Sequence, residues 1–226
     1  MQTLTDNDNY LAECCIIVDV KEECILGCGA EATVRRTEYL GRDAVIKTRT
    51  PKSYRHPGLD QRLRSSRTKN EVRIMTEARR AGVRTPVIYD IDVRECNIVM
   101  EYVVGRKAKD VLDSEPSEYY TLCRKIGETV AELHNGRISH GDLTTSNIIL
   151  MPDGELCFFD FSLGNASADI EDMGVDIHLL QRAFTSAHSG LEKGLDEMIR
   201  SYKKKMNDSD NVMERVEEIR SRGRYT

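Results

Sequence analysis

The sequence predicts an α+β fold in two parts, an antiparallel sheet with one long helix followed by a mostly helical region. Short β-branched segments separated by turn residues fill the first third of the chain. In the second half, apolar residues recur at intervals of three and four. The pattern changes in a segment bounded by Gly105 and Pro116. We therefore divide the chain into residues 1–104 and residues 105–226.

Composition is typical of a soluble globular protein and disfavours several functional classes. Hydrophobic residues make up 39% and charged residues 31% of the 226 positions. The net charge of −5 argues against nucleic-acid binding through overall charge but does not exclude a local basic patch. We see no signal peptide and no apolar run long enough for a membrane span. Seven cysteines without a CxxC pair favour reduced thiols, so we expect a cytoplasmic or nuclear protein without membrane contact.

Strands and one helix are predicted in order along the first region. Gly41 and Arg42 form a turn between two strands, and a basic stretch, residues 52–67, leads into a helix. That helix has about 20 residues and ends near Ala81 and Gly82. The expected strands cover residues 16–18, 24–26, 33–37, 44–47, 87–92 and 97–103.

The second region is predicted to consist of helices around one hairpin. Strands at residues 148–150 and 156–159 flank a turn through Asp153 and Gly154. Three helices are expected from about residue 170 to the end of the chain. Before the hairpin, one helical face is formed by Tyr119, Cys123, Ile126, Val130 and Leu133.

A glycine-rich turn is expected between two of the first strands, in the sequence GCGAEATV. It contains Gly27, Cys28, Gly29 and Ala30, and the glycines would let backbone N–H groups approach phosphate oxygens closely. No helix follows, so the pattern is not a Rossmann dinucleotide fingerprint. On its own it fits a plain hairpin turn better than a phosphate site.

A lysine ends the apolar strand sequence AVIK. Lys47 would be unremarkable as an edge lysine. It also follows the glycine turn at the distance of one hairpin, which would bring its ammonium near the same phosphates. An acidic partner would be needed to hold it there. Glu71 on the following helix is the first candidate and Glu77 the second, although most helix glutamates face solvent.

The loop HGDLTTSN carries an aspartate and an asparagine five positions apart. Asp142 could accept a proton from a hydroxyl or water, and Asn147 could offer an oxygen to Mg²⁺. Asp160, in FFDFSLG, follows the next strand, and the predicted hairpin would bring it back toward Asn147. Each residue alone would most often be a cap or turn residue. Their order after the glycine turn, Lys47 and Glu71 reverses that balance.

This ordered set resembles a protein kinase over nearly the whole chain, which implies a two-lobed fold with an antiparallel-sheet N-lobe and a reduced helical C-lobe. The resemblance implies phosphoryl transfer with ATP and Mg²⁺. Lys47, tethered by Glu71, would hold the α- and β-phosphates, Asp142 would be the catalytic base, and Asn147 and Asp160 would bind Mg²⁺. It also implies ATP contacts from the glycine turn and from a hinge formed by Met100, Glu101, Tyr102 and Val103.

Three residues depart from the kinase pattern. Gly141 stands where an arginine usually grips a phosphorylated activation loop, Thr144 replaces a usual lysine, and Ser162 turns DFG into DFS. No APE motif follows, and residues 161–226 are too few for a full C-lobe with a peptide-binding platform. We therefore expect no control by an activation loop and inefficient general protein phosphorylation.

Longer stretches narrow the resemblance to the small atypical kinase of the KEOPS complex, the PRPK type or Kae-associated kinase. These stretches are YRHPGLDQRLRSSRTKNE, HGDLTTSN, VDIHLLQRAF and RVEEIRSRGRY. The resemblance implies an ATPase with weak serine/threonine kinase activity that supports threonylcarbamoyladenosine modification of tRNA. The implied partners are the threonylcarbamoyl-transferase subunit, a small subunit docked on the N-lobe, and tRNA through the complex.

The resemblance also assigns roles outside the main motifs. The C-terminal tail with Arg220, Arg222 and Arg224 is implicated at the side facing tRNA and the transferase, although its charge alone fits a solvated end. Asp176 resembles the buried kinase aspartate that holds the backbone of the catalytic loop. We expect His140 to brace that loop without transferring protons.

Two rival functions stay open. The pattern HGDxxxxN also occurs in small-molecule phosphotransferases of the aminoglycoside- and choline-kinase type, but those enzymes have larger C-lobes. A non-catalytic pseudokinase would also suit Thr144, Ser162 and Ala32, which stands where the glycine turn of kinases has a third glycine. The intact Lys47, Asp142, Asn147 and Asp160 argue against this interpretation.

Overall fold

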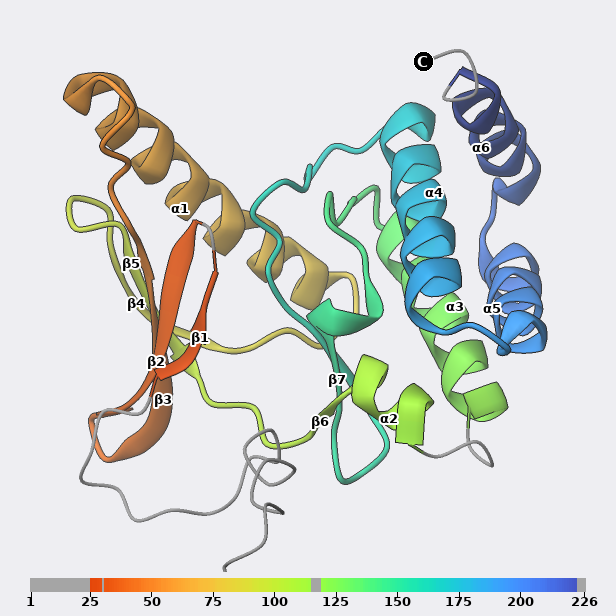
Figure 1. Cartoon of the computed structure of the whole chain (residues 1–226), viewed down its shortest axis with the longest axis horizontal. Helices are drawn as coiled ribbons and strands as arrows, with labels where there is room; N and C mark the ends of the chain where they lie inside the picture. The colour runs from red at the N-terminus through yellow and green to blue at the C-terminus, as the bar shows by residue number, and fades with distance from the viewer. Residues whose placement is uncertain (1–24, 30, 115–118, 223–226) are drawn as a thin grey trace, which may run out of the picture.

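The computed structural model describes residues 25–29, 31–114 and 119–222. Figure 1 shows a strand-rich part with one long helix beside a part made mostly of helices, which is the predicted arrangement. The strand expected at residues 16–18 lies outside the described residues, as do Ala30, Arg224 and the side chain of Cys28.

Five antiparallel strands form the first sheet, in the order β1-β2-β3-β5-β4. Leu40 and Gly41 form the turn between β2 and β3 with φ angles of 51° and 75°. A two-residue hairpin turn favours left-handed backbone at both positions, so the turn lies one residue earlier than predicted. The strands are β1 (Ile25–Cys28), β2 (Ala32–Tyr39), β3 (Arg42–Arg49), β4 (Ile88–Asp92) and β5 (Asn97–Glu101).

Helix α1 (Pro57–Arg80) begins inside the basic stretch that was expected to precede it. Pro57 fits the first turn of a helix, and arginine has a high helix propensity, so the basic residues extend the helix. The helix ends just before Gly82, as predicted. Its buried face includes Ile74 and, unusually for a carboxylate, Glu71, which is 0% exposed.

The boundary segment between Gly105 and Pro116 contains two elements that the sequence did not predict, strand β6 (Arg106–Lys107) and helix α2 (Ala108–Ser114). β6 pairs with β7 (Ile148–Leu150), which pairs with β8 (Leu156–Phe158) in a second sheet. Such short elements gain their stability from tertiary packing, so the local sequence signal is weak. The chain passes from the first sheet to the second through residues 102–105.

Four longer helices complete the second part. The predicted apolar face of the first one packs into the core, and the three helices expected after residue 170 are present. Asp169 caps the second through a reciprocal capping box with Asp172. The helices are α3 (Tyr119–Asn135), α4 (Ile170–Ala187), α5 (Glu192–Lys205) and α6 (Ser209–Arg222).

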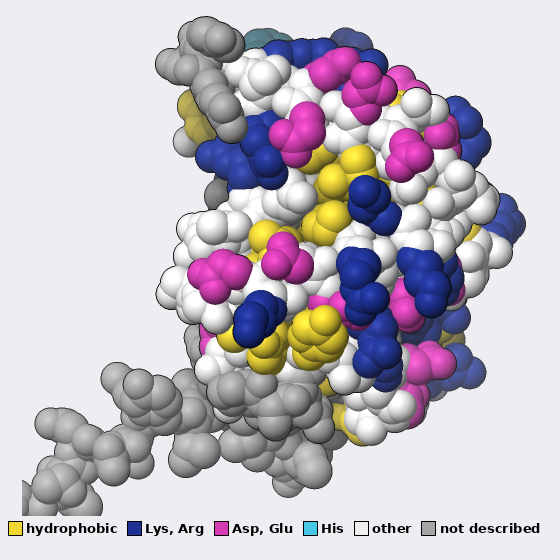
Figure 2. Space-filling view, turned by 90° about the vertical axis from the view of Figure 1, so that its right-hand side faces the viewer, with side chains coloured by type: hydrophobic (Ala, Val, Ile, Leu, Met, Phe, Trp, Pro, Cys, Tyr) yellow, Lys and Arg dark blue, Asp and Glu magenta, His cyan; other side chains and the backbone are white. Residues whose placement is uncertain are grey.

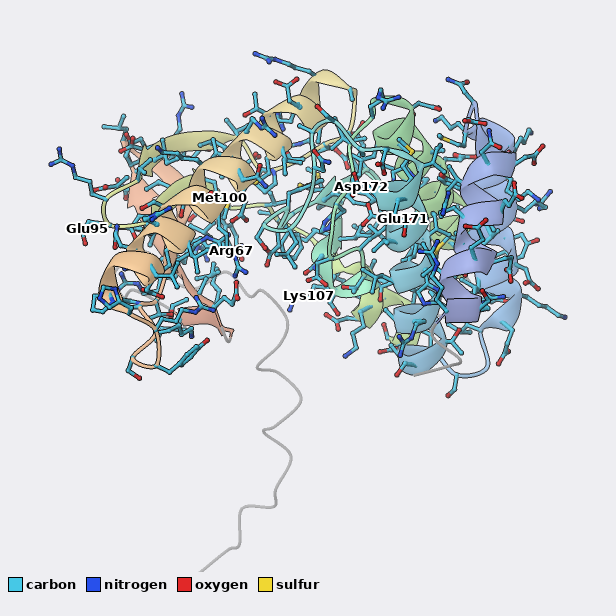
Figure 3. All side chains as sticks on the ribbon, turned by 90° about the horizontal axis from the view of Figure 1, so that it is seen from above. Arg67, Glu95, Met100, Lys107, Glu171 and Asp172 are labelled. Carbon is cyan, nitrogen blue, oxygen red and sulfur yellow. The ribbon has the colours of Figure 1, made fainter. Side chains whose placement is uncertain are left out.

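The surface carries charges of both signs. On the side of α5 and α6, basic and acidic side chains are interspersed with a few apolar ones (Figure 2). From above, Arg67 and Met100 lie in the sheet part, Glu171 and Asp172 in the helical part, and Lys107 between them (Figure 3). Among the described residues, no helix combines the length and apolar character needed to cross a membrane.

Candidate active site

Lys47 lies on the central strand β3 and joins three elements of the fold. Its Nζ is 2.7 Å from Oε1 of Glu71 on α1 and 2.8 Å from Oδ1 of Asp160, which follows β8. The lysine side chain is 7% exposed. Glu77, the second candidate partner, instead pairs with Arg80 on the same helix. The structure thus brings together the lysine, the helix glutamate and the aspartate that the sequence pointed to.

Arg49 is a member of this cluster that the sequence analysis missed. Residues two apart on a strand share a face, so Arg49 points the same way as Lys47. Its Nη2 is 2.5 Å from Oε2 of Glu71. The single buried carboxylate of Glu71 therefore holds two cations, one with each oxygen. The K-x-R spacing on β3 is the sequence pattern from which this position of Arg49 could have been predicted.

Asp160 is held in its charged form. Burial opposes ionisation, but the charge and hydrogen bond of Lys47 outweigh it and hold the pKa of the Asp160 carboxyl below its ordinary value. The Ser162 hydroxyl also hydrogen-bonds the carboxylate and lowers this pKa. The serine of DFS, noticed in the sequence only as a departure, thus has a function in supporting Asp160.

Asp142 and Asn147 are linked within the loop. Nδ2 of Asn147 donates to the backbone oxygen of Asp142 at 2.8 Å and to its Oδ2 at 3.1 Å. The Asp142 side chain is otherwise exposed, so a substrate hydroxyl can reach it. Phe159 N donates to Asn147 O at 3.1 Å, which brings Asn147 beside the residue that precedes Asp160.

The donor set fits a magnesium ion only together with a nucleotide. No group of three or more His, Cys, Asp or Glu side chains within the described residues could hold a metal ion. Asp160 offers a charged carboxylate, and the amide oxygen of Asn147 accepts no hydrogen bond in the described part of the chain. Mg²⁺ prefers such oxygens and normally completes its shell with water and phosphate oxygens.

Asp176 on α4 holds the backbone of the catalytic loop through hydrogen bonds. It is fully buried, and its carboxylate accepts from the backbone N–H of His140 at 2.5 Å and of Gly141 at 2.8 Å. His134 lies 3.4 Å from the same carboxylate. The expected loop-holding function of Asp176 therefore has a direct geometric basis.

His140 braces the loop from inside. Its Nε2 is 3.0 Å from the backbone oxygen of Phe159, and its Nδ1 accepts from the backbone N–H of Asp142 at 3.3 Å. This network assigns the proton to Nε2. Burial lowers the pKa of His140, so the ring is neutral at neutral pH.

Gly141 leaves no room for the arginine found in most kinases. Its φ is +80°, and a Cβ there would lie 2.3 Å from the backbone carbon and oxygen of Leu163. The following chain is tied back by a bridge between Ser139 and Asn165. Residues 161–169 alone separate Asp160 from α4, so the structure has no room for a long activation loop.

A second hydrogen-bond network, which the sequence did not predict, also supports the catalytic loop. Oγ1 of Thr145 lies 3.0 Å from Nε2 of His188, and Nδ1 of His188 lies 2.7 Å from Oδ1 of Asp113. These residues come from the catalytic loop, the end of α4 and the end of α2. No local pattern could have predicted contacts between such distant positions.

The glycine turn is open by comparison. Gly29 N donates to Ala32 O at 3.0 Å. A Cβ on Gly27 would meet nothing within 4 Å, and one on Gly29 only Ala32 O at 3.6 Å. The fold itself therefore does not require either glycine, which leaves space for a ligand.

The expected hinge is only partly free for adenine. Met100 is paired on both sides within the sheet, and Glu101 N donates to Val87 O at 2.8 Å. The Glu101 carboxylate bonds Arg84, so its side chain is structural. Tyr102 N donates to Asp43 O at 3.4 Å. The N–H of Val103 makes no hydrogen bond within the described residues and is the best-placed donor for a base.

The tail candidate lies away from this cluster. Arg222, at the end of α6, pairs with Glu171 at 3.0 Å and with Glu218 at 3.5 Å. Within the described structure, it makes no hydrogen bond or ion pair with the residues around Lys47 or Asp142. The structure therefore joins Arg222 to the α4–α6 surface and not to the predicted catalytic residues.

Comparisons with known proteins agree with this geometry. A family model described as RIO domain matches residues 33–168. The KEOPS complex subunit Bud32 of Pyrococcus abyssi is 39% identical over 207 residues, covering 87% of this chain and 94% of that protein. A probable bifunctional tRNA threonylcarbamoyladenosine biosynthesis protein of Methanothermobacter thermautotrophicus is 43% identical over 202 residues. That match covers 89% of this chain but 36% of the relative, so the chain spans little more than a third of such bifunctional proteins.

A solved structure shows the same fold at low identity. The crystal structure of the Rio2 kinase-ADP/Mg²⁺-phosphoaspartate complex from Chaetomium thermophilum superposes with a TM-score of 0.59 and 15% identity. The match covers 88% of this chain and 70% of that one. At this identity the comparison establishes the two-lobed fold alone.

Proposed function

This chain belongs to the RIO-domain family, in the branch of the KEOPS subunit Bud32, and from this premise we propose that it is a Mg²⁺-dependent ATPase with weak serine/threonine kinase activity. The observation that carries the proposal is the contact of Lys47 with both Glu71 and Asp160. It holds a cation for the phosphates beside the carboxylate that would bind the metal.

The chain's own residues would perform distinct steps. Lys47, held by Glu71, would bind and orient the α- and β-phosphates of ATP. Asp160 and Asn147 would hold Mg²⁺, which when bound would neutralise the charge of the transferring phosphate. Asp142 would accept the proton of the attacking water or hydroxyl at its carboxylate, oriented by the Asn147 amide.

Hydrolysis is favoured over transfer to protein substrates. Residues 161–169 pass directly from Asp160 into α4, which leaves no extended segment on which a peptide could lie. Water needs no such platform. We therefore propose that serine/threonine phosphorylation is a minor activity of the same centre.

The relatives' names suggest where this activity is used. We propose that the chain works in a KEOPS-type assembly with the threonylcarbamoyl-transferase subunit and a small subunit on the N-lobe. The assembly would modify tRNA with threonylcarbamoyladenosine, in the cytoplasm or nucleus.

Two rivals remain as alternatives. A small-molecule phosphotransferase would need an acceptor site in the C-lobe, but α4, α5 and α6 pack on each other and on α3 without an inserted domain. A pseudokinase would tolerate loss of Asp142, whereas the Asn147 hydrogen bonds hold that carboxylate in place.

The test is Mg²⁺-dependent ADP release by the full chain, alone and with its transferase partner. We expect Lys47→Ala and Asp142→Ala to lower turnover by roughly 10²-fold or more while far-UV circular dichroism stays unchanged. Lys203→Ala, at an exposed position on α5, is the control for loss of a lysine. Wild-type turnover in either folded variant would refute the proposal. Robust transfer to an amino-alcohol acceptor would favour the first rival, and no hydrolysis in any condition the second.

A further inference from the structure

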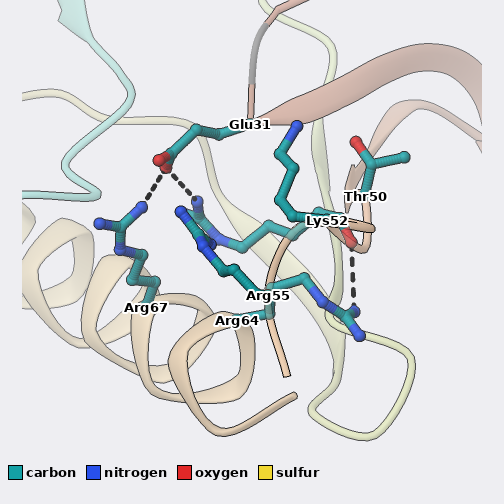
Figure 4. Close-up of a pocket in the computed structure, with 7 residues that line it drawn as sticks. Glu31, Thr50, Lys52, Arg55, Arg64 and Arg67 are labelled. Atoms are coloured by element: carbon teal, nitrogen blue, oxygen red, sulfur yellow. Dashed lines mark hydrogen bonds and ion pairs between the residues drawn. The ribbon is translucent and has the colours of Figure 1, made fainter. Parts of the chain in front are cut away.

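A basic hollow lies on the first lobe, on the far side of Glu71 from Lys47. It is a small hollow that opens to solvent at one side. Figure 4 shows Arg67 reaching Glu31 from α1, with Lys52 and Arg55 beside it. The hollow is lined by Glu31, Arg49, Thr50, Lys52, Arg55, Arg64 and Arg67.

Positive charge is in excess within this hollow. Residues 49–67 contain six lysines and arginines but one acidic residue, in a chain whose net charge is −5. Within the described residues, three acids pair with the local cations: Glu31, Asp60 and Glu71. Each is shared between two bases, so these three carboxylates leave an excess of positive charge in the described part of the cluster.

Arg49 provides a buried donor that no protein group uses. Its side chain is 3% exposed, and Nε has no hydrogen-bond partner within the described structure. Nη1 is 3.9 Å from Glu31, too far for a hydrogen bond. A buried guanidinium N–H without an acceptor costs free energy, and a bound oxygen would remove that cost. The hollow is therefore built for an anion.

Tyr54 does not line the hollow but lies against Arg55, which does, and this neighbour favours nucleic acid over a small anion. Tyr54 is 76% exposed, and the Arg55 guanidinium lies over its ring at 5.2 Å. An exposed aromatic ring beside phosphate-binding cations is the combination that stacks on a base while the cations hold the backbone. A phosphorylated peptide would not need the exposed ring.

We propose that this hollow, defined by Arg49, Lys52, Arg55 and Arg67, binds a backbone phosphate of RNA, with Tyr54 stacking on an adjacent base. The choice of RNA rests on the proposed function, whereas the charge and stacking arguments apply to nucleic acids in general. The site is separate from the phosphates of ATP, because the Glu71 carboxylate lies between Arg49 and Lys47.

The experiment measures anisotropy of a fluorescent RNA stem-loop on the full chain across a series of KCl concentrations. Lys52→Ala/Arg55→Ala should weaken binding roughly tenfold and lower the salt slope by about one to two. The matched control is Lys203→Ala/Lys204→Ala, which removes the same charge from exposed positions of α5. Equal losses in the two double variants, or none in the first, would overturn the proposal.

Two further variants exclude trivial explanations. Glu31→Gln removes the competing carboxylate of the hollow and should tighten RNA binding a few-fold, a gain that misfolding cannot produce. Tyr54→Ala should weaken the binding of single-stranded RNA more than the binding of inorganic phosphate, which is measured by competition.

Two outcomes would assign the hollow to another ligand. Complete displacement of RNA by Mg-ATP would mean that the hollow belongs to the nucleotide site. Preferential binding of a phosphoserine peptide would mean that the ligand is a phosphorylated protein. Either result would overturn the proposal.

Basal ATP hydrolysis separates this proposal from the proposed function. The Lys52→Ala/Arg55→Ala variant should hydrolyse ATP at the wild-type rate without RNA, since neither side chain contacts Lys47, Asp142 or Asp160 in the described structure. Loss of RNA binding with intact hydrolysis supports the hollow as an RNA site. If the wild-type chain lacks hydrolysis but RNA binding responds to the variants as stated, the proposed function fails and this one stands.

Discussion

The catalytic loop and the glycine turn face the same site but are held very differently. In the loop, the Asp176 carboxylate accepts hydrogen bonds from two backbone N–H groups. The His140 ring accepts a hydrogen bond from the backbone N–H of Asp142. The Asn147 amide donates to the backbone oxygen and to the carboxylate of Asp142. In the described residues of the turn, the backbone hydrogen bonds outside the β1–β2 ladder are Gly29 to Ala32 and Thr50 to Glu31.

The difference separates the two tasks of the site. A catalytic base must already be oriented when the substrate arrives, and buried hydrogen bonds fix that orientation during folding. A phosphate-covering turn must open and close, so few contacts are an advantage. We infer that the half of the site carrying the base is formed before ATP binds.

Removing the support of the catalytic loop should have the largest effect. Asp176→Ala leaves two buried N–H groups without their acceptor, so the free energy of unfolding should fall by about 2–5 kcal/mol. ATP hydrolysis should fall together with it. Urea denaturation measures the first effect and ADP release the second. Asp196→Ala, at an exposed position on α5, is the control. An Asp176→Ala protein as stable as the control would show that the loop is held by other contacts.

A methyl group in the catalytic loop should have the next largest effect. Gly141→Ala introduces a Cβ at a φ of +80° and within 2.3 Å of Leu163 backbone atoms. We expect a loss of about 2–4 kcal/mol in the free energy of unfolding, from strain and overpacking together. The thermal midpoint and the urea midpoint should both fall. Unchanged midpoints would mean that the segment after Asp160 moves aside at little cost.

The same methyl group in the glycine turn should leave stability intact. Gly29→Ala meets only Ala32 O, at an ordinary 3.6 Å, so the free energy of unfolding should change by less than about 0.5 kcal/mol. We expect the KM for ATP to rise a few-fold, since the methyl takes space near the phosphates, with little change in kcat. Steady-state kinetics at varied ATP separates the two constants. A stability loss equal to that of Gly141→Ala would erase the contrast between the regions.

The smallest effect is expected at Ser162. Ser162→Gly removes a hydrogen bond to the charged form of Asp160, so its pKa should rise toward the ordinary value. The acid limb of kcat/KM against pH should therefore move to higher pH by a few tenths. The lowered pKa of Asp160 stabilises the folded protein at pH values above the pKa that this carboxyl has in the unfolded chain. That stabilisation is lost as the pH falls through the folded-state pKa. The variant should therefore have a slightly lower free energy of unfolding near neutral pH. Ser167→Gly, in the same segment, should leave the profile unchanged.

Local patterns were sufficient for the residues that lie on regular elements or in the loops directly beside them. Lys47, Glu71, Asp142, Asn147 and Asp160 were named because strand alternation, a helix and a hairpin limit where their side chains can point. Arg49 was within reach of the same reasoning, through its spacing from Lys47.

Other features depend on contacts that a single sequence does not display. Helix α2 was not predicted within the boundary segment because it is a single short element stabilised by packing. The Thr145, His188 and Asp113 network joins three distant segments. The clash that excludes a side chain at Gly141 depends on the path of Leu163, which only the folded chain reveals.

The short connection at residues 161–169 has a consequence for the time course of the reaction. An enzyme whose activation segment must first be modified starts slowly and accelerates as modified molecules accumulate. Here the connection is already tied to the loop through Ser139 and Asn165. We therefore expect progress curves of ADP formation that are linear from mixing, with no lag and no dependence on preincubation with ATP. Such a catalyst needs no modification of this connection before its first turnover.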